Sequence, residues 1–144
     1  MSPNLTTEVF WARGHTNIQA IHPTTLMFTK DINVSENGDC IVAMSADKSV
    51  ADLSIYFKEE LRKPNAKVTV TIEVGDFREE IKAVGSPKLR LCHPTDLVIR
   101  KSNYVCNRTL AISANKSSID LPRGLVEKLQ DSKQKVKVTL SVES

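Results

Sequence analysis

Two stretches of this sequence are near copies of each other, and this internal repeat constrains the fold more than any other feature. Residues 45–53 (SADKSVADL), the signature stretch, recur as residues 113–121 (SANKSSIDL). Shifting the chain by 68 positions aligns residues 38–74 with residues 106–142 and gives 14 identities. A chain that repeats over such a length is predicted to contain two similar structural units.

A second offset extends the repeat towards the N-terminus. A shift of 71 positions aligns residues 7–30 with residues 78–101, including a His-Pro-Thr motif in both. The offsets differ by three residues, and the loop 31–39 is expected to absorb this difference. Two long units do not make a solenoid of short stacked repeats. We therefore expect a single domain, residues 1–144, built of two repeats at about 7–74 and 78–142.

The composition is typical of a soluble globular protein. Of 144 residues, 40% are hydrophobic and 26% are charged, so a core can form and a long disordered tail is not expected. The net charge of +3 is spread along the chain. It favours an anionic partner, and we rank small anionic ligands above nucleic acid.

The N-terminal segment and the cysteines predict a cytoplasmic protein that does not enter a membrane. Residues 1–7 contain neither the basic nor the apolar region of a signal peptide, and no run approaches the ~18 apolar residues of a transmembrane helix. Cys40, Cys92 and Cys106 are odd in number and lack Cys-x-x-Cys spacing. Neither a disulfide framework nor a zinc site is therefore expected, and no cofactor is indicated.

Alternating apolar residues predict a mainly β fold. The alternation is clearest in residues 67–74 and in their copy, 135–142. Apolar residues at i, i+4 and i+8 predict one short helix in each copy. About ten strands and two short helices are expected to form an internally duplicated β-sandwich or barrel with pseudo-twofold symmetry. The predicted strands are residues 8–13, 18–21, 26–30, 40–45 and 67–74, and their copies 79–84, 89–92, 97–101, 108–113 and 135–142.

The connection between the copies predicts two strand pairs. Only Gly75 and Asp76 separate the strand 67–74 from the next strand, so these two strands are expected to form a hairpin. Pseudo-symmetry then predicts that the C-terminal strand 135–142 pairs with the N-terminal strand 8–13, which would leave few open edges.

Five motifs spread along nearly the whole chain carry a resemblance to a known family. They are Gly14-His15-Thr16-Asn17, His22-Pro23-Thr24-Thr25, Gly38-Asp39-Cys40-Ile41, Ala46-Asp47-Lys48 and residues 100–109 (RKSNYVCNRT). Together they resemble the archaeal domain-of-unknown-function family 371. The resemblance implies a compact, mainly β, cytoplasmic archaeal protein and transfers no activity. Asn115 stands where the family's second Ala-Asp-Lys motif has aspartate, which bears on any role that needs a carboxylate there.

His22 and His93 occupy equivalent positions before proline and are the candidate catalytic residues. If a pseudo-twofold axis brought both imidazoles to one cleft, they could act as acid and base or bind a metal. The alternative is a turn at the end of a strand, repeated in both copies, because proline favours extended geometry in the preceding residue. No carboxylate adjoins both histidines in the sequence, which favours the turn, and we assign no metal.

Lys48 and Lys116 are candidate ligand-binding residues because they lie between a predicted strand and a predicted helix. Main-chain N–H groups, the helix dipole and an ammonium group can together hold a phosphate or carboxylate there. The alternative is a pair of solvated lysines. Asp52 and Asp120 fall just before the predicted helices, and we expect them to be the helix N-caps.

Arg100 and Arg108 are further candidate ligand-binding residues, found in the second copy only, since Thr29 and Cys40 stand opposite them. Two guanidinium groups suit a phosphorylated ligand, although surface strands also carry such charges. Cys40 and Cys106 are interpreted as buried thiols, because a nucleophile needs a base and a lowered pKa that the sequence does not show.

These residues lead to two hypotheses about function. The first is a binding module or enzyme for a small anionic metabolite, phosphorylated or carboxylated. Its anion would be held by Lys48, Lys116, Arg100 and Arg108, with His22 or His93 near the reacting group. The alternative is a non-catalytic RNA-associated or assembly protein. Aromatic residues make up only 5% of the chain, so RNA binding would depend on phosphate contacts rather than stacking.

Overall fold

The computed structural model describes residues 5–33 and 37–144, and this part of the chain contains eight strands, two α-helices and two 3₁₀-helices. The predicted loop 31–39 includes residues 34–36, which lie outside the described residues. In chain order the elements are β1 (Leu5–Arg13), β2 (Thr25–Thr29), β3 (Ile41–Ala43), η1 (Val50–Asp52), α1 (Ile55–Leu61), β4 (Lys67–Val74), β5 (Phe77–Val84), β6 (Asp96–Arg100), β7 (Thr109–Ala111), η2 (Ser118–Asp120), α2 (Arg123–Leu129) and β8 (Lys135–Glu143).

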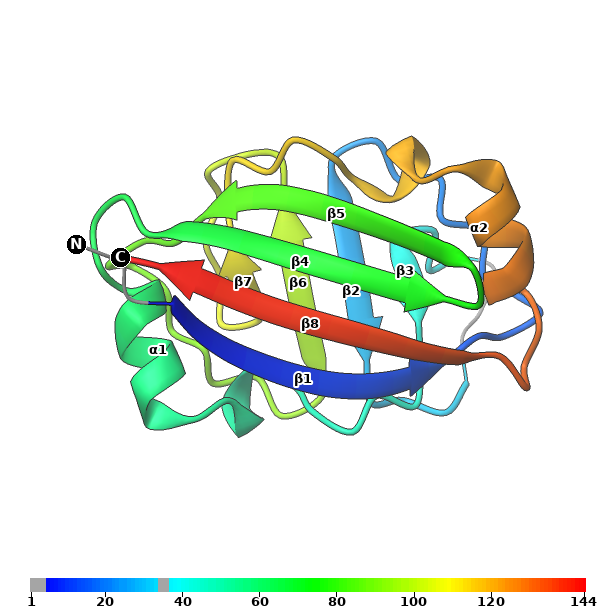
Figure 1. Cartoon of the computed structure of the whole chain (residues 1–144), viewed down its shortest axis with the longest axis horizontal. Coiled ribbons are helices and arrows are strands. Elements are labelled where there is room, and N and C mark those ends of the chain that lie inside the picture. Colours follow the sequence, from blue (N-terminus) through cyan, green and yellow to red (C-terminus); the bar gives the residue numbers. More distant parts are fainter. Residues whose placement is uncertain (1–4, 34–36) are drawn as a thin grey trace.

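The four long strands form an antiparallel sheet in the order β1-β8-β4-β5 (Figure 1). Alternate residues of each strand are buried because side chains of a β-strand point to opposite faces. In β8, for example, Val136, Val138, Leu140 and Val142 are completely buried. The other face of this long sheet carries exposed or partly exposed side chains, including Trp11 and Arg13.

The four shorter strands form a second sheet in the order β3-β2-β6-β7. The central pair, β2 and β6, is antiparallel, whereas the edge strands β3 and β7 run parallel to their neighbours. The inner face packs on the long sheet, with the rings of Phe28 and Phe10 in edge-to-face contact at 5.3 Å between centroids. β2 and β6 are also largely buried on their outer face, so they have little of the alternation of a half-exposed strand.

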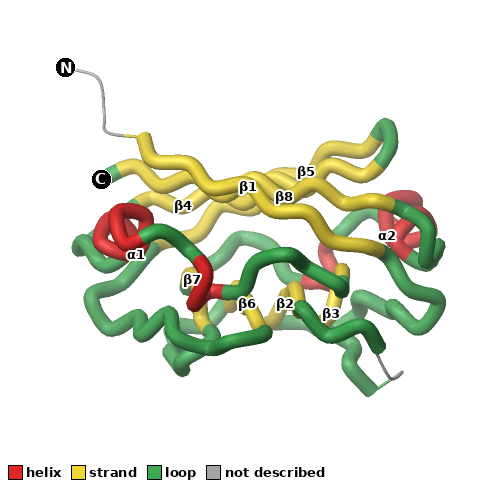
Figure 2. The backbone as a smooth tube through the Cα atoms, turned by 90° about the horizontal axis from the view of Figure 1, so that it is seen from below, coloured by secondary structure: helices red, strands yellow, loops and turns green. Residues whose placement is uncertain are grey.

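The two sheets lie in separate layers with their strands crossing, and α1 and α2 lie at opposite ends of the molecule (Figures 1 and 2). The predicted mainly β sandwich is therefore confirmed, without closure into a barrel. Among the described residues, only the isolated bridges Arg13 to Met44 and Val84 to Ile112 join the sheets through main-chain pairing.

Both predicted strand pairs are present. β4 and β5 form the hairpin, with Val74 opposite Phe77. β1 and β8 pair over nine residues, from Leu5 opposite Glu143 to Arg13 opposite Lys135. The element order β1-β2-β3-η1-α1-β4 is followed by β5-β6-β7-η2-α2-β8, so both halves of the chain present their elements in the same order. Duplication as the origin of this order stays a prediction from the sequence.

Eight strands form instead of about ten, because residues 18–21 and 89–92 are not strands. Ala20 and Leu91 have φ values of 51° and 53°, in the left-handed region that interrupts extended backbone. Their neighbours Ile18 and Leu89 are nevertheless buried in the core. The alternation in these segments therefore reflects burial of loop side chains and not pairing in a sheet.

The predicted N-caps of the helices are wrong by a few residues. Ser54 is the N-cap of α1, and its side chain accepts a hydrogen bond from the N–H of Phe57 at 3.1 Å. Pro122 occupies the same place before α2. Asp52 and Asp120 instead lie in the third positions of η1 and η2, where each accepts the main-chain N–H of the serine three residues earlier. A short 3₁₀-helix lies between the strand and the α-helix in each half, so the N-caps come later in the chain than predicted.

Gly14 and Gly85 connect each half of the chain to the helix of the other half. A Cβ atom at Gly14 would lie 2.2 Å from the carbonyl oxygen of Leu129 in α2, and one at Gly85 would lie 2.1 Å from that of Leu61 in α1. Both contacts are with backbone that cannot move aside cheaply. Any larger residue would push the strand end away from the helix, so these two positions require glycine.

Candidate functional site

The outer face of the short sheet carries a group of polar side chains that we call the arginine-cysteine cluster: Asp96, Arg100, Cys106, Arg108 and Thr109. Asp96 and Arg100 are the two ends of β6, Thr109 begins β7, and the other two residues lie in the loop before β7. Side chains alternate along β6, so Asp96 and Arg100 point away from the core that contains Leu97 and Ile99. The structure thus brings together Arg100 and Arg108, both singled out from the sequence.

The thiol of Cys106 lies among hydrogen-bond donors. Arg100 Nη2 is 3.3 Å from Cys106 Sγ, and Thr109 Oγ1 is 3.4 Å from it. Burial raises the pKa of Cys106, but hydrogen bonds from Thr109, the Arg108 main chain and Arg100 outweigh burial and lower the pKa to about 7. The lowered pKa favours the thiolate, the nucleophilic form of cysteine, near neutral pH.

Arg100 has no carboxylate partner among the described residues. Its Nε donates to Thr109 Oγ1 at 3.2 Å, and its guanidinium carbon lies 5.0 Å from the centroid of the Tyr104 ring. A guanidinium over an aromatic face is attracted to the ring, which helps to hold its plane in place. Arg100 therefore presents an oriented cation, with no carboxylate partner in the described residues, beside the sulfur of Cys106.

Arg108 lies in the same cluster, but a carboxylate compensates its charge. Arg108 Nη1 is 3.1 Å from Asp96 Oδ2, and the second carboxylate oxygen accepts hydrogen bonds from Thr29 at 2.9 Å and Thr95 at 3.1 Å. Burial lowers the pKa of Arg108, but the ion pair with Asp96 outweighs burial and raises it. These contacts hold the side chains of Arg108 and Asp96 in place at the edge of the cluster.

The three cysteines have different environments, and all are free thiols. Burial raises the pKa of the half-buried Cys40, whereas Cys92 is exposed. Cys106 is also only half-buried, which differs from the buried thiol interpreted from the sequence. The signal that could have identified it is Arg100 six residues before and Arg108 two residues after, since cations favour the thiolate.

The two candidate catalytic histidines lie apart and perform the same local task. His22 Nδ1 accepts the main-chain N–H groups of Thr24 at 3.2 Å and Thr25 at 3.1 Å. His93 Nδ1 accepts those of Thr95 at 3.2 Å and Asp96 at 2.9 Å. The histidines precede two antiparallel strands, β2 and β6, and so lie at opposite ends of that pair. The structure does not bring them into one cleft.

His93 is the histidine that adjoins the arginine-cysteine cluster. Its Nε2 atom lies 4.0 Å from Asp96 Oδ2. Because Nδ1 accepts two N–H groups, the neutral ring carries its proton on Nε2, as inferred from these hydrogen bonds. A role for His22 or His93 in proton transfer stays a prediction.

Lys48 and Lys116 are paired with carboxylates of edge strands. Lys48 Nζ is 2.8 Å from Glu8 Oε1 in β1, and Lys116 pairs in the same way with Glu79 in β5. Glu8 also accepts the main-chain N–H of Ser54 at 2.7 Å. Burial raises the pKa of Glu8, but the hydrogen bonds from Lys48 and Ser54 outweigh burial and lower it. Each lysine thus lies beside a compensating negative charge. Within the described residues, its hydrogen bonds do not involve Arg100 or Arg108.

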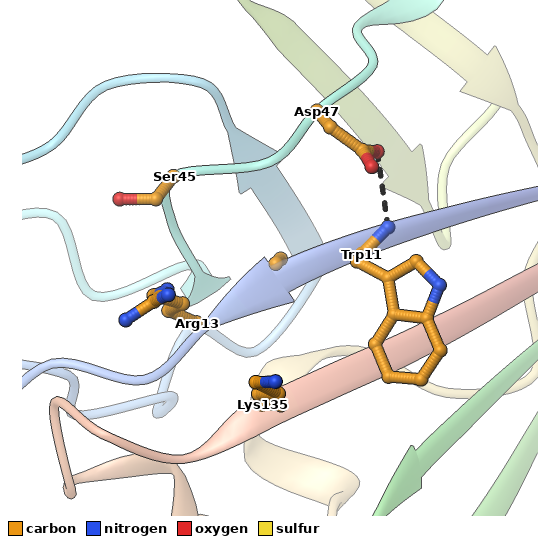
Figure 3. Close-up of a pocket in the computed structure, with 6 residues that line it drawn as sticks. Trp11, Arg13, Ser45, Asp47 and Lys135 are labelled. Carbon is orange, nitrogen blue, oxygen red and sulfur yellow. Dashed lines mark hydrogen bonds between the residues drawn. The ribbon is translucent and has the colours of Figure 1, made fainter.

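Two of the hollows on the surface of the described residues lie away from the arginine-cysteine cluster. One, of about 340 Å³, lies at the edge strand β1 and is shown in Figure 3. It is lined by Trp11, Ala12, Arg13, Ser45, Asp47 and Lys135. The other, of about 410 Å³, lies beside α2 and is lined by Phe77, Gly124, Glu127, Lys128, Asp131 and Gln134.

Within the described residues, 5–33 and 37–144, no group of three or more His, Cys, Asp or Glu side chains could hold a metal ion. None of the helices there is long and apolar enough to cross a membrane.

Comparison with known proteins identifies relatives over most of the chain. An uncharacterised protein of Methanocaldococcus jannaschii is 49% identical over 123 residues, which is 85% of this chain and 90% of that protein. Residues 10–143 match a family described as a domain of unknown function, DUF371. The match includes both sheets and the arginine-cysteine cluster, and it agrees with the resemblance carried by the sequence motifs. The chain therefore belongs to the DUF371 family of domains of unknown function.

Proposed function

We propose that the chain binds a small phosphorylated or carboxylated metabolite at the arginine-cysteine cluster. The observation that carries this proposal is Arg100, a guanidinium oriented by Tyr104 and Thr109 and without a carboxylate partner in the described chain. A guanidinium offers parallel N–H donors that match the two oxygens of a carboxylate or phosphate. Arg108, already paired with Asp96, adds rigidity at the edge of the cluster.

The position of Cys106 supports this assignment and adds a nucleophile to the proposed site. An anion bound to Arg100 would lie next to Sγ, which is 3.3 Å from the same guanidinium group. A thiolate at that distance could displace a leaving group from an electrophilic carbon or phosphorus of the ligand: the S–C or S–P bond forms as the bond to the leaving group breaks, and the leaving group departs with its electron pair. The proposal assigns Arg100 to binding and Cys106 to the reacting position, and it leaves Lys48 and Lys116 in their ion pairs with glutamates.

Anion binding and the ionisation of Cys106 are linked, which provides the experiment. A bound anion adds negative charge beside Sγ, so it should disfavour the thiolate and slow the alkylation of Cys106. Peptide mass spectrometry after iodoacetamide treatment at pH 7 would measure each cysteine separately. Inorganic phosphate, a sugar phosphate and citrate are the probes, at millimolar concentration.

The expected result is slower modification of Cys106 with at least one probe, while modification of Cys92 is unchanged. The midpoint temperature of thermal denaturation should rise in parallel, since a ligand at 100 times its Kd stabilises the folded protein by about 2.7 kcal/mol. The variant Arg100→Gln should lose both effects, and the matched variant Lys48→Gln should keep them. Protection that persists in Arg100→Gln, or no protection by any probe, would contradict the proposal.

A further inference from the structure

The hollow at β1 combines an exposed aromatic ring with a fixed backbone. The side chain of Trp11 is 47% exposed on the open face of the long sheet. The main chain of Trp11 is held by Asp47, which accepts its N–H through Oδ1 at 3.0 Å and donates its own N–H to the Trp11 carbonyl at 3.0 Å. Figure 3 shows the indole beside β8, with Asp47 and Ser45 on the segment that passes β1.

Two cations of this hollow lie opposite each other and form no ion pair within the described residues. Arg13 and Lys135 are direct cross-strand partners in the pairing of β1 with β8. Like charges directly opposite on a sheet destabilise it. Neither side chain forms an ion pair with a carboxylate of the described residues. Two residues further along the same strand pair, Lys137 lies opposite Trp11. Figure 3 shows that Arg13 and Lys135 lie next to each other in the hollow.

The other half of the chain lacks this combination at its equivalent place. The positions that correspond to Trp11 and Arg13 are Lys82 and Val84, in the edge strand β5. The Asp47 contact does recur, because Asn115 bonds to Lys82 in the same way. The backbone arrangement is therefore common to both halves, whereas the aromatic ring and the arginine belong to one. The hydrogen bonds to the edge strand therefore require neither the Trp11 ring nor the Arg13 side chain.

We propose that this hollow binds one nucleotide unit, with the base stacked on Trp11 and the phosphate held between Arg13 and Lys135. Indole faces stack bases of any sequence, and paired basic side chains neutralise phosphates. The second oxygen of Asp47 and the hydroxyl of Ser45 lie at the rim, where they can accept or donate hydrogen bonds to base or sugar. This site lies on the long sheet, so it is separate from the arginine-cysteine cluster and does not depend on the function proposed there.

The nucleotide unit can come from a free nucleotide or from a single strand of RNA, and one titration distinguishes them. Trp11 is the single tryptophan of the chain, so fluorescence excited at wavelengths that tyrosine does not absorb reports this hollow alone. Adenosine monophosphate and a hexamer of adenylate are the two probes, at about 50 mM salt where phosphate contacts are strong. Quenching by both with similar affinity indicates a free nucleotide site, whereas quenching by the hexamer alone indicates RNA.

Two controls separate the parts of the recognition. Adenosine lacks the phosphate and ribose 5-phosphate lacks the base, so each should bind at least about tenfold more weakly than the adenylate probe that binds. The double variant Arg13→Gln/Lys135→Gln should lose quenching, and its matched control, Lys67→Gln/Lys82→Gln, should keep it. The salt dependence of hexamer binding should also fall by about 0.7 in slope in the first variant, because the one phosphate held between these side chains is no longer neutralised.

The variant Trp11→Ala removes the reporter, so its affinity is measured by polarisation of a labelled hexamer or by calorimetry with the mononucleotide. Loss of one stacked base should weaken binding about 5- to 150-fold. No quenching by either probe, equal binding of adenosine, or quenching that survives in the Arg13→Gln/Lys135→Gln variant would each overturn the proposal.

Discussion

The side-chain oxygen Oδ1 of Asn115 accepts a hydrogen bond from the main-chain N–H of Lys82 at 2.9 Å, and the N–H of Asn115 donates to the Lys82 carbonyl at 2.9 Å. Lys82 lies in β5, an edge strand whose free N–H and C=O groups could otherwise pair with another chain. Asp47 makes the same two hydrogen bonds with Trp11 in β1, at the other edge. The role requires an acceptor oxygen and not a charge, so asparagine can stand in the second copy.

This equivalence predicts that Asp47→Asn is neutral while Asp47→Ala and Asn115→Ala are not. Each alanine variant loses one side-chain hydrogen bond to an edge strand and should lower the free energy of unfolding by about 0.5–1.5 kcal/mol. Urea denaturation would measure the difference. A loss in Asp47→Asn equal to that in Asp47→Ala would show that the carboxylate charge matters.

The second prediction concerns the pH dependence of Cys106. Since its pKa is about 7, the alkylation rate of Cys106 should rise with a midpoint near pH 7. Arg100→Gln removes one donor and one cation from Sγ, so it should move that midpoint upward and slow alkylation at pH 7 several-fold. Cys40, whose pKa burial raises, should react at higher pH only and serves as the internal comparison. A midpoint of Cys106 unchanged by Arg100→Gln would refute the role assigned to the guanidinium.

Substitutions of His22 and His93 can separate a structural role of these residues from a catalytic one. Asparagine can place its Oδ1 atom about where histidine has Nδ1, so His22→Asn and His93→Asn should retain the turn hydrogen bonds, whereas the alanine variants should lose about 1–2 kcal/mol each. Thermal or urea denaturation would show this rescue. Asparagine variants as unstable as the alanine variants would contradict the turn role, and stable asparagine variants that lose an activity would identify proton transfer.

The sequence predicted the long sheet better than the short one, for a physical reason. β4 and β8 have one buried and one open face, so their residues alternate. The hairpin partner of β4 follows from the two-residue connection, and the pairing of β8 with β1 follows from the pseudo-symmetry of the repeat. β2 and β6 are buried on both faces and therefore carry no such period. The segments around Ala20 and Leu91 imitate strands because their side chains enter the core, although positive φ angles prevent pairing.

The candidate site divides in the same way. Arg100 and Arg108 could be found from the sequence because they break the repeat, and β6 and the loop before β7 bring them together. Two arginines near Cys106 in the sequence favour its thiolate, but the lowered pKa itself depends on the distances of Sγ from Arg100 and Thr109, six and three positions away, which only the fold determines. The hollow at Trp11 likewise forms between segments more than thirty residues apart in the chain.

Acid should destabilise the protein partly through Glu8. Its pKa is lower in the folded protein than the ordinary value of 4.5, so its contribution to stability is present above pH 4.5 and is lost as the pH falls through the folded value. Glu8→Gln should therefore reduce the free energy of unfolding by about 1–3 kcal/mol at pH 7 and flatten its decline below pH 4.5. Urea denaturation from pH 3 to pH 7 would measure both effects. An unchanged acid slope in Glu8→Gln would assign the decline to other carboxylates.

Removal of β8 should unfold the whole domain. β8 lies between β1 and β4 in the long sheet, so its main-chain groups pair on both sides. A chain that ends at Lys135 would also lose the four core residues Val136, Val138, Leu140 and Val142. At about 1.5–3 kcal/mol for each buried side chain, that loss rivals the 5–15 kcal/mol of a typical domain. Circular dichroism should show no cooperative melt, whereas a chain lacking only Glu143 and Ser144 should melt nearly as the parent does. A cooperative transition in the shorter chain would show that β1 and β4 hold the fold without their central strand.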